Sequence, residues 1–269
     1  MKRALTYFVL LFFACVMALP FYSMIVTSLR PQAELGSASF QFGVHHPSLE
    51  AYGELLSEPL FVHAAVNSFI VAVLLTLGNI VLCPLAGYAF AKHRFPGRDA
   101  IFSILLATMM IPGTVLLVPG FLLFRDFGWL DTWLPLIVPG LVGVFGVFLA
   151  RQFIFGIPDS LIDAAKIDGY GEGRIFSRIV MPLSRPLLAT LGIFAFLGSW
   201  NSFVGPLIVL LSENKYTLPL VIAMLQGRYV GKENVQMAGA TLSILPVLLV
   251  FLIFQNQIVK SLATSGLKD

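Results

Sequence analysis

The segment between residues 157 and 186 holds the chain's clearest group of side chains for a specific polar contact. Asp163 and Asp168 flank the pair Ala164 and Ala165, and Gly169 follows directly. Two small side chains would let another protein's surface approach closely, and the carboxylates could bind basic groups at the edge of that contact. The segment contains no reactive group. It therefore predicts a docking surface, although a solvated amphipathic linker would carry similar charges.

The same segment contains the start and stop signals of two short helices. Pro158 followed by Asp159 and Ser160 is typical of a helix N-terminus, because the side-chain oxygens can accept hydrogen bonds from the first free amides. Gly169 and Gly171 would end this helix, and the residues after them allow a second one. We therefore expect a helix, a glycine turn and another helix.

Other residues that often carry chemistry are not grouped. The histidines are scattered and have no metal-ligand spacing: His45, His46, His63 and His93. Cys15 and Cys83 lie inside apolar runs, where packing is the expected role. The nearest lookalike of a phosphate-binding loop, Gly227 to Lys232, has the wrong glycine spacing. We predict no catalytic residue, no metal site and no cofactor held by this chain.

Composition places the chain in a membrane. Of its 269 residues 58% are hydrophobic and 12% are charged, whereas about a quarter are charged in an ordinary soluble domain. The net charge of +3 is spread in short clusters, so nucleic-acid binding has no basic stripe. Six uncharged runs are long enough to cross a bilayer as helices. They are Ala4–Leu29, Ala64–Ala91, Ala100–Phe124, Thr132–Ala150, Pro186–Ser212 and Val235–Val259.

Basic residues set the predicted orientation, because lysine and arginine collect on the cytoplasmic side. One side holds Lys2, Arg3, Lys92, Arg94, Arg98, Arg151, Lys166, Arg174, Arg178, Arg185, Lys260 and Lys268, and the other holds Arg30, Arg125, Lys215, Arg228 and Lys232. Both termini and the loop 151–185 are therefore predicted to be cytoplasmic. The expected organisation is a first span with an extracytoplasmic loop (1–62), a five-helix transmembrane domain (63–259) and a cytoplasmic tail (260–269).

A motif in the docking segment resembles a known family. The pattern Asp-Ala-Ala-x-x-Asp-Gly, then Ile-x-x-Pro-Leu-x-x-Pro ending at Pro186, is similar to the cytoplasmic "EAA" loop of permease subunits in bacterial binding-protein-dependent ATP-binding cassette importers. Three positions depart from the usual pattern: Asp163 stands for Glu, Met181 for Leu, and Gly171 for a small hydroxylic residue or alanine. The shorter carboxylate of Asp163 weakens the case for a direct ion pair with the ATPase.

The resemblance covers nearly the whole chain and points to the carbohydrate branch. Its further motifs are Asn67-Ser68, residues 86–91, Phe95-Pro96-Gly97, Trp200-Asn201-x-Phe203 and Pro206-Leu207. It implies an all-α membrane protein with six transmembrane helices in the type I importer permease fold, in the bacterial plasma membrane. The helix 159–170 would contact the ATPase. The residues implied for this coupling are Leu161, Asp163, Ala164, Ala165, Asp168, Gly169 and Pro182.

The implied complex has several partners. It contains a second permease, usually a different chain, two ATPase subunits that hold ATP and Mg²⁺, and an extracytoplasmic solute-binding protein. The solute would be a sugar. Candidate residues of its path offer uncharged hydrogen-bonding groups or a flat apolar face: Ser199, Trp200, Asn201, Ser202 and Asn67. Hydrogen bonds between helices are an equally ordinary role for such residues in membranes.

Two other functions remain open at this stage. A gradient-driven secondary transporter or channel usually buries ionisable residues in its spans, and the six runs contain no Asp, Glu, Lys or Arg. A membrane scaffold without transport activity would not call for a helix-glycine-helix segment of this spacing. Both observations favour an importer that receives its energy from another subunit.

Overall fold

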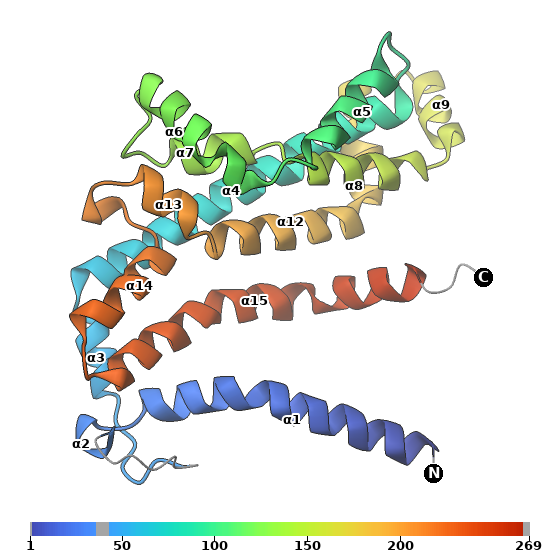
Figure 1. Cartoon of the computed structure of the whole chain (residues 1–269). Helices are drawn as coiled ribbons and strands as arrows, with labels where there is room; N and C mark the ends of the chain where they lie inside the picture. The colour runs from blue at the N-terminus through green and yellow to red at the C-terminus, as the bar shows by residue number, and fades with distance from the viewer. Residues whose placement is uncertain (1, 36–42, 266–269) are drawn as a thin grey trace. The chain divides into compact units, whose positions relative to one another are not determined.

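The computed structural model describes residues 2–35 and 43–265, and side chains within 3–35 and 43–255. All regular structure in these ranges is helical (Figure 1), as predicted. The longer helices are α1 (Lys2–Ser28), α4 (Pro59–Lys92), α5 (Arg98–Thr108), α6 (Leu117–Asp126), α8 (Val144–Phe155), α9 (Asp159–Ile167), α12 (Arg185–Trp200), α14 (Leu218–Arg228) and α15 (Glu233–Ser265). The shorter ones are α2 (Gln32–Leu35), α3 (Glu50–Leu56), η1 (Gly113–Leu116), α7 (Leu134–Ile137), η2 (Val138–Gly140), α10 (Glu172–Ile175), the π-helical turn η3 (Phe176–Val180), α11 (Met181–Leu183), α13 (Val204–Val209) and η4 (Glu213–Lys215).

Several of these helices are long and apolar enough to cross a bilayer. Four uninterrupted stretches meet this criterion of length and composition: Arg3–Ser28, Pro59–Lys92, Leu134–Phe155 and Glu233–Gln255. Two bent pairs qualify only as pairs, α5 with η1–α6 at 90° and α10–α11 with α12 at 80°. The described residues thus supply four to six spans. The predicted count of six and the cytoplasmic side of the termini stay predictions.

Prolines interrupt two of the predicted spans. The third span is interrupted between Thr108 and Gly113, because Pro112 disfavours helical geometry in the residue before it. In the fifth, α12 ends at Trp200 and a separate helix, α13, carries Pro206. A proline ring at 206 clashes with the carbonyl four residues earlier in a continuous helix. Predicting one span over Pro186–Ser212 was therefore wrong in its last third.

Packing divides the chain into two units, Met1–Ala65 with Leu218–Leu248, and Val66–Thr217 with Leu249–Asp269. In the first unit, α3, α14 and α15 bury Leu55, Leu225 and Val235. The ion pairs Glu54–Lys232 and Glu58–Arg228 join α3 and the residues after it to the end of α14 and the turn before α15, at 2.7 and 3.2 Å. The domain boundaries predicted from the sequence concern membrane topology and stay predictions. Of the predicted tail, residues 266–269 lie outside the described residues.

The second unit is built on the close approach of α4 to the α7–α8 segment. Glycines make this approach possible: a Cβ added at Gly140 would lie 2.7 Å from Leu75, and one at Gly146 would lie 2.7 Å from the Cys83 sulfur. On the facing side, a Cβ at Gly87 would lie 2.5 Å from that of Ala150. These glycines thus allow close helix packing, and α4 is the central support of the unit.

Candidate functional site

The docking segment forms an elbow, which we define as residues 159–183 with α9, α10, η3 and α11. Its turn closes α9 with a Schellman motif: the Tyr170 amide donates to the Ala165 carbonyl at 2.9 Å and the Gly169 amide donates to the Lys166 carbonyl at 3.0 Å. Gly169 has φ +79°, a conformation that glycine adopts without steric cost. The predicted order of helix, glycine turn and second helix is confirmed.

The inner face of the elbow is a small hydrophobic core. Ile162 and Ala165 of α9 are buried, together with Ile154 of α8 and with Ile175 and Val180 of the elbow's second part. Buried apolar contacts of this kind stabilise by about 25 cal/mol per Å² of area removed from water. The elbow is therefore fixed to the unit and cannot move as a free linker would.

Polar contacts fix both parts of the elbow to the end of α4. The Lys92 ammonium lies 2.6 Å from the Asp159 carboxylate, and its side chain is only 6% exposed. This ammonium holds the pKa of Asp159 below its usual range. The Tyr88 hydroxyl donates to the Glu172 carboxylate at 2.8 Å. Asp159 had been predicted to cap α9; it makes no capping hydrogen bond, because its carboxylate binds Lys92.

The outer face of the elbow presents the residues predicted for coupling. Leu161, Asp163, Ala164, Asp168 and Gly169 of α9 and its turn are exposed, and so is Pro182. Ala165 is the exception: it is 5% exposed and packs in the elbow's own apolar core. Of the alanine pair predicted to face a partner, only Ala164 is on the outer face.

One outward residue was missed in the sequence. Ile167 is 87% exposed although it is large and apolar. Helical spacing was the available signal, since Ile162 and Ala165 occupy the inward face three residues apart, which turns Ala164 and Ile167 outward. Ile167 and Leu161, which is 45% exposed, are the large apolar side chains that α9 presents to solvent.

A cleft borders this outer face. Its volume is about 820 Å³, and it lies between α9, the end of α4 and the start of α5. The charged residues that line it are Lys92, Arg94, Arg98, Asp99, Asp159, Asp163 and Lys166. A partner that seats here would meet charges of both signs.

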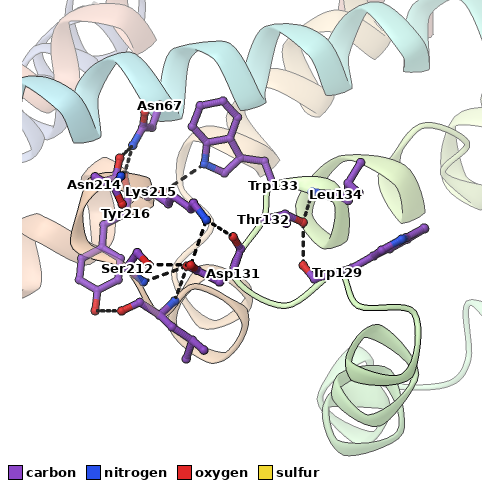
Figure 2. Close-up of polar contacts among 11 residues, drawn as sticks. Asn67, Trp129, Asp131, Thr132, Trp133, Leu134, Ser212, Asn214, Lys215 and Tyr216 are labelled. Atoms are coloured by element: carbon purple, nitrogen blue, oxygen red, sulfur yellow. Dashed lines mark hydrogen bonds and ion pairs between the residues drawn. The ribbon is translucent and has the colours of Figure 1, made fainter.

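At the other end of α4, a second polar cluster joins two loops (Figure 2). The Asp131 carboxylate accepts hydrogen bonds from the Ser212 hydroxyl at 2.6 Å and from the amides of Ser212 and Leu211 at 2.9 and 3.0 Å. The Lys215 ammonium lies 2.9 Å from the same carboxylate. These donors, with the Ser212 hydroxyl first, hold the pKa of Asp131 well below its usual range. We call this cluster the clamp.

Asn67 is part of the clamp and lines a cavity of about 380 Å³ together with Asp131 and Trp133. Its side-chain amide donates to the carbonyls of Asn214 and Tyr216 at 2.8 and 3.0 Å (Figure 2). The Trp133 indole also donates to the Lys215 carbonyl at 3.1 Å. Asn67 and Lys92 are separated along α4 by about 38 Å, at roughly 1.5 Å per residue. One helix therefore links the clamp to the elbow over more than the ~30 Å hydrocarbon core of a bilayer.

A cavity of about 490 Å³ lies between α4, α7, α12 and α13. Ser199 and Ser202 line it, as do the buried residues Asn79 and Thr217. Two neighbouring residues that were also predicted for the path, Trp200 and Asn201, do not line this cavity. Trp200 is buried and stacks on Phe196 at 5.7 Å between ring centroids, and the Asn201 amide donates to the Leu197 carbonyl of its own helix.

The sequence matches a known protein family. Residues 84–264 fit the family described as binding-protein-dependent transport system inner membrane component. The chain belongs to this family. The membership predicted from the motif of the elbow is thus confirmed, and the elbow lies entirely within the matched residues.

Several relatives and solved structures align with nearly the whole length of this permease. The arabinooligosaccharides transport system permease protein AraQ of Halalkalibacterium halodurans is 32% identical, over 96% of this chain and 93% of its own. The lactose transport system permease protein LacG of Rhizobium radiobacter is 31% identical, over 96% and 94%. A chain of a bacterial ABC transporter for import of the acidic polysaccharide alginate superimposes with a TM-score of 0.84 at 25% identity, covering 94% and 95%. The predicted permease fold is confirmed.

Neutralising the centre of the clamp should loosen the permease loop that it holds. Asp131→Asn would remove the charge that binds Lys215 and would present an amide N–H₂ to groups that are themselves donors. We expect severalfold faster limited proteolysis within residues 211–216 of the folded protein. Asp126→Asn is the matched control, because its pair with Arg125 is exposed on both sides and such pairs contribute little.

The clamp should not weaken when the pH falls from 7 to 5. Because the pKa of Asp131 is lowered by folding, its contribution is fully present above the unfolded value of about 3.9 and is lost as pH falls through the lower folded pKa. Proteolysis of the loop should therefore not change between pH 7 and pH 5. Equal cleavage of Asp131→Asn and wild type would contradict the clamp's role.

Proposed function

We propose that this chain is a permease subunit of an ATP-driven importer and that its solute is a sugar. Relatives named as permeases for arabinooligosaccharides and for lactose support the solute class. The observation that carries the proposal is the elbow, whose two parts are fixed to one end of α4 by Lys92–Asp159 and Tyr88–Glu172. The chain would form half of the translocation pathway.

Energy would reach the permease through contact. Two separate ATPase subunits would hold ATP and Mg²⁺, and α9 with the turn at Gly169 would seat in a depression of one of them. The exposed residues Leu161 and Ile167 supply apolar contact, and the neighbouring cleft supplies charge. When the ATPases close on ATP, the elbow moves. ATP can shift the permease between two states only because the ATPase contact differs between those states.

From the elbow, the force would then be transmitted to α4. Its receiving residues are Lys92 and Tyr88, and the apolar core beneath α9 prevents the elbow from sliding over the helix end. Since α4 continues for about 38 Å to Asn67, a tilt at the elbow displaces the loop 211–216 that Asn67 and Asp131 hold. The clamp would thus open or close in step with the ATPases.

The remaining partners follow from this arrangement. We place the chain in the bacterial plasma membrane with the elbow and both termini in the cytoplasm. An extracytoplasmic solute-binding protein would dock at the side of the clamp; a solved alginate transporter carries a periplasmic protein in its complex. A second permease, a different chain, would complete the pathway. Ser199 and Ser202 are the path residues that line a cavity.

Co-purification tests the proposal. The tagged permease, co-expressed with a second permease, an ATPase and a solute-binding protein from its own genome, should yield one stable complex. Its ATP hydrolysis should rise when the solute-loaded binding protein is added. Gradient-driven flux by the permease alone would support a secondary transporter instead, and a stable complex without any solute-dependent hydrolysis or flux would support a scaffold.

A further inference from the structure

The cavity that contains Ser199 and Ser202 has an unusual chemical lining. Among the described residues that line it none carries a formal charge. Its polar groups are the hydroxyls of Ser199, Ser202 and Thr217 and the side-chain amide of Asn79. Phe194, which is 56% exposed, contributes an aromatic side chain to the lining. Neutral hydroxyl and amide groups beside an apolar ring are what a saccharide ring, with its hydroxyl edge and C–H faces, requires.

Thr217 adds an observation that helix packing does not explain. The residue is 4% exposed, and its hydroxyl oxygen is buried without a hydrogen-bond partner. Leaving a buried hydroxyl unpaired destabilises the protein, so such a group points to a partner that it meets in another state. Thr217 follows directly on the loop 211–216, which the clamp fixes through Asp131 and Asn67. The clamp therefore positions this hydroxyl at the cavity.

Asn79 is oriented in the same cavity by the protein itself. Its side-chain amide donates to the Gly140 carbonyl at 3.2 Å, and the residue is 7% exposed. This bond fixes the side chain between α4 and the residues before α8. The cavity thus has positioned polar groups on two sides, from α4 and from the residues after α12.

We propose that this cavity is a solute subsite for an uncharged saccharide, in which the Thr217 hydroxyl, buried in this state, turns into the cavity and pairs with a hydroxyl of the solute. The assignment rests on the proposed function and deepens it by naming the charge class of the solute. A carboxylate or phosphate would lose its hydration here without meeting a cation, which is strongly unfavourable. The permease would in this respect differ from the transporter of the acidic polysaccharide alginate, whose chain it resembles.

Thiol protection in the assembled complex tests the subsite without depending on selection by the binding protein. Ser199→Cys is introduced together with Cys15→Ala, while the buried Cys83 is retained. Maltotriose and arabinotriose are the neutral probes, and trigalacturonate is the acidic one. We expect a neutral probe to slow maleimide labelling of position 199 by about threefold to tenfold, the range for one or two hydrogen bonds, and trigalacturonate to leave the rate unchanged.

Two threonine variants separate recognition from structure. Thr217→Val keeps the shape but removes the unpaired hydroxyl, and it should abolish the protection. Thr190→Val is the matched control in α12, because the Thr190 hydroxyl donates to the Pro186 carbonyl of its own helix; protection should persist. Equal protection by both charge classes, no protection by any probe, or protection that survives Thr217→Val would overturn the subsite.

The same preparation keeps this failure distinct from failure of the proposed function. ATP hydrolysis stimulated by the loaded binding protein reports whether the chain is a permease of an ATP-driven importer. Stimulated hydrolysis without protection rejects only the subsite, whereas a complex without stimulated hydrolysis rejects the importer itself.

Discussion

Replacing Gly169 by valine is expected to abolish solute-stimulated ATP hydrolysis and uptake while the complex still assembles. Gly169 has φ +79°, and a β-branched residue strongly disfavours this left-handed region, by more than the ~1–2 kcal/mol of an ordinary side chain. No atom lies within 4 Å of an added Cβ, so the effect comes from backbone strain and not from collision. The turn would rearrange and α9 would be presented to the ATPase at another angle.

The measurement is the ratio of uptake to assembly in proteoliposomes, for which we expect a fall of about tenfold or more, since a change of 1.4 kcal/mol alters an equilibrium tenfold. Gly171→Ala is the matched control: Gly171 lies two residues away, has φ −74° and also faces open space. Gly169→Asn should retain intermediate activity, because asparagine tolerates the left-handed region. Normal uptake by Gly169→Val in an intact complex would remove the elbow from the coupling mechanism.

The elbow also shows how far sequence reasoning reaches. Its two helices and the turn at Gly169 could be predicted because proline and glycine act locally, through their own backbone geometry. The attachment of the elbow could not be predicted. Lys92 and Asp159 are distant in the sequence, and nothing local indicates that Asp159 binds a lysine instead of capping its own helix.

Long-range contacts explain the remaining differences as well. The apolar runs coincide with four helices that are long and apolar enough to cross a bilayer, because hydropathy is a property of each segment alone. Whether Asn67 faces a solute or a loop depends on residues 214–216, which lie in another part of the sequence. The same holds for Asp131, whose φ of +56° and four donors have no signature in the surrounding residues.

The contact between α4 and α8 gives the second large expected effect. Gly87→Ala should destabilise the permease by about 1–3 kcal/mol, the usual cost of overpacking a tight core. The added Cβ would lie 2.5 Å from the Ala150 Cβ, 2.7 Å from the Arg151 amide nitrogen and 2.8 Å from the Ala150 carbonyl carbon. Two of these are backbone atoms, so no side chain can rotate away, and α4 must separate from α8.

Thermal unfolding in detergent measures this effect, with Gly120→Ala as the control. Gly120 also lies inside a helix, α6, but its added Cβ would meet only Phe124 at an ordinary 3.7 Å. That variant should be neutral or slightly more stable, because alanine favours helix over glycine by roughly 0.5–1 kcal/mol. Since Gly87 precedes Tyr88, which holds the elbow through Glu172, separation of the helices should also reduce coupling in the protein that remains folded. Equal melting of both variants would mean that α4 and α8 are not in contact at Gly87 in the membrane, and α4 could then not carry motion from the elbow to the clamp as one packed element.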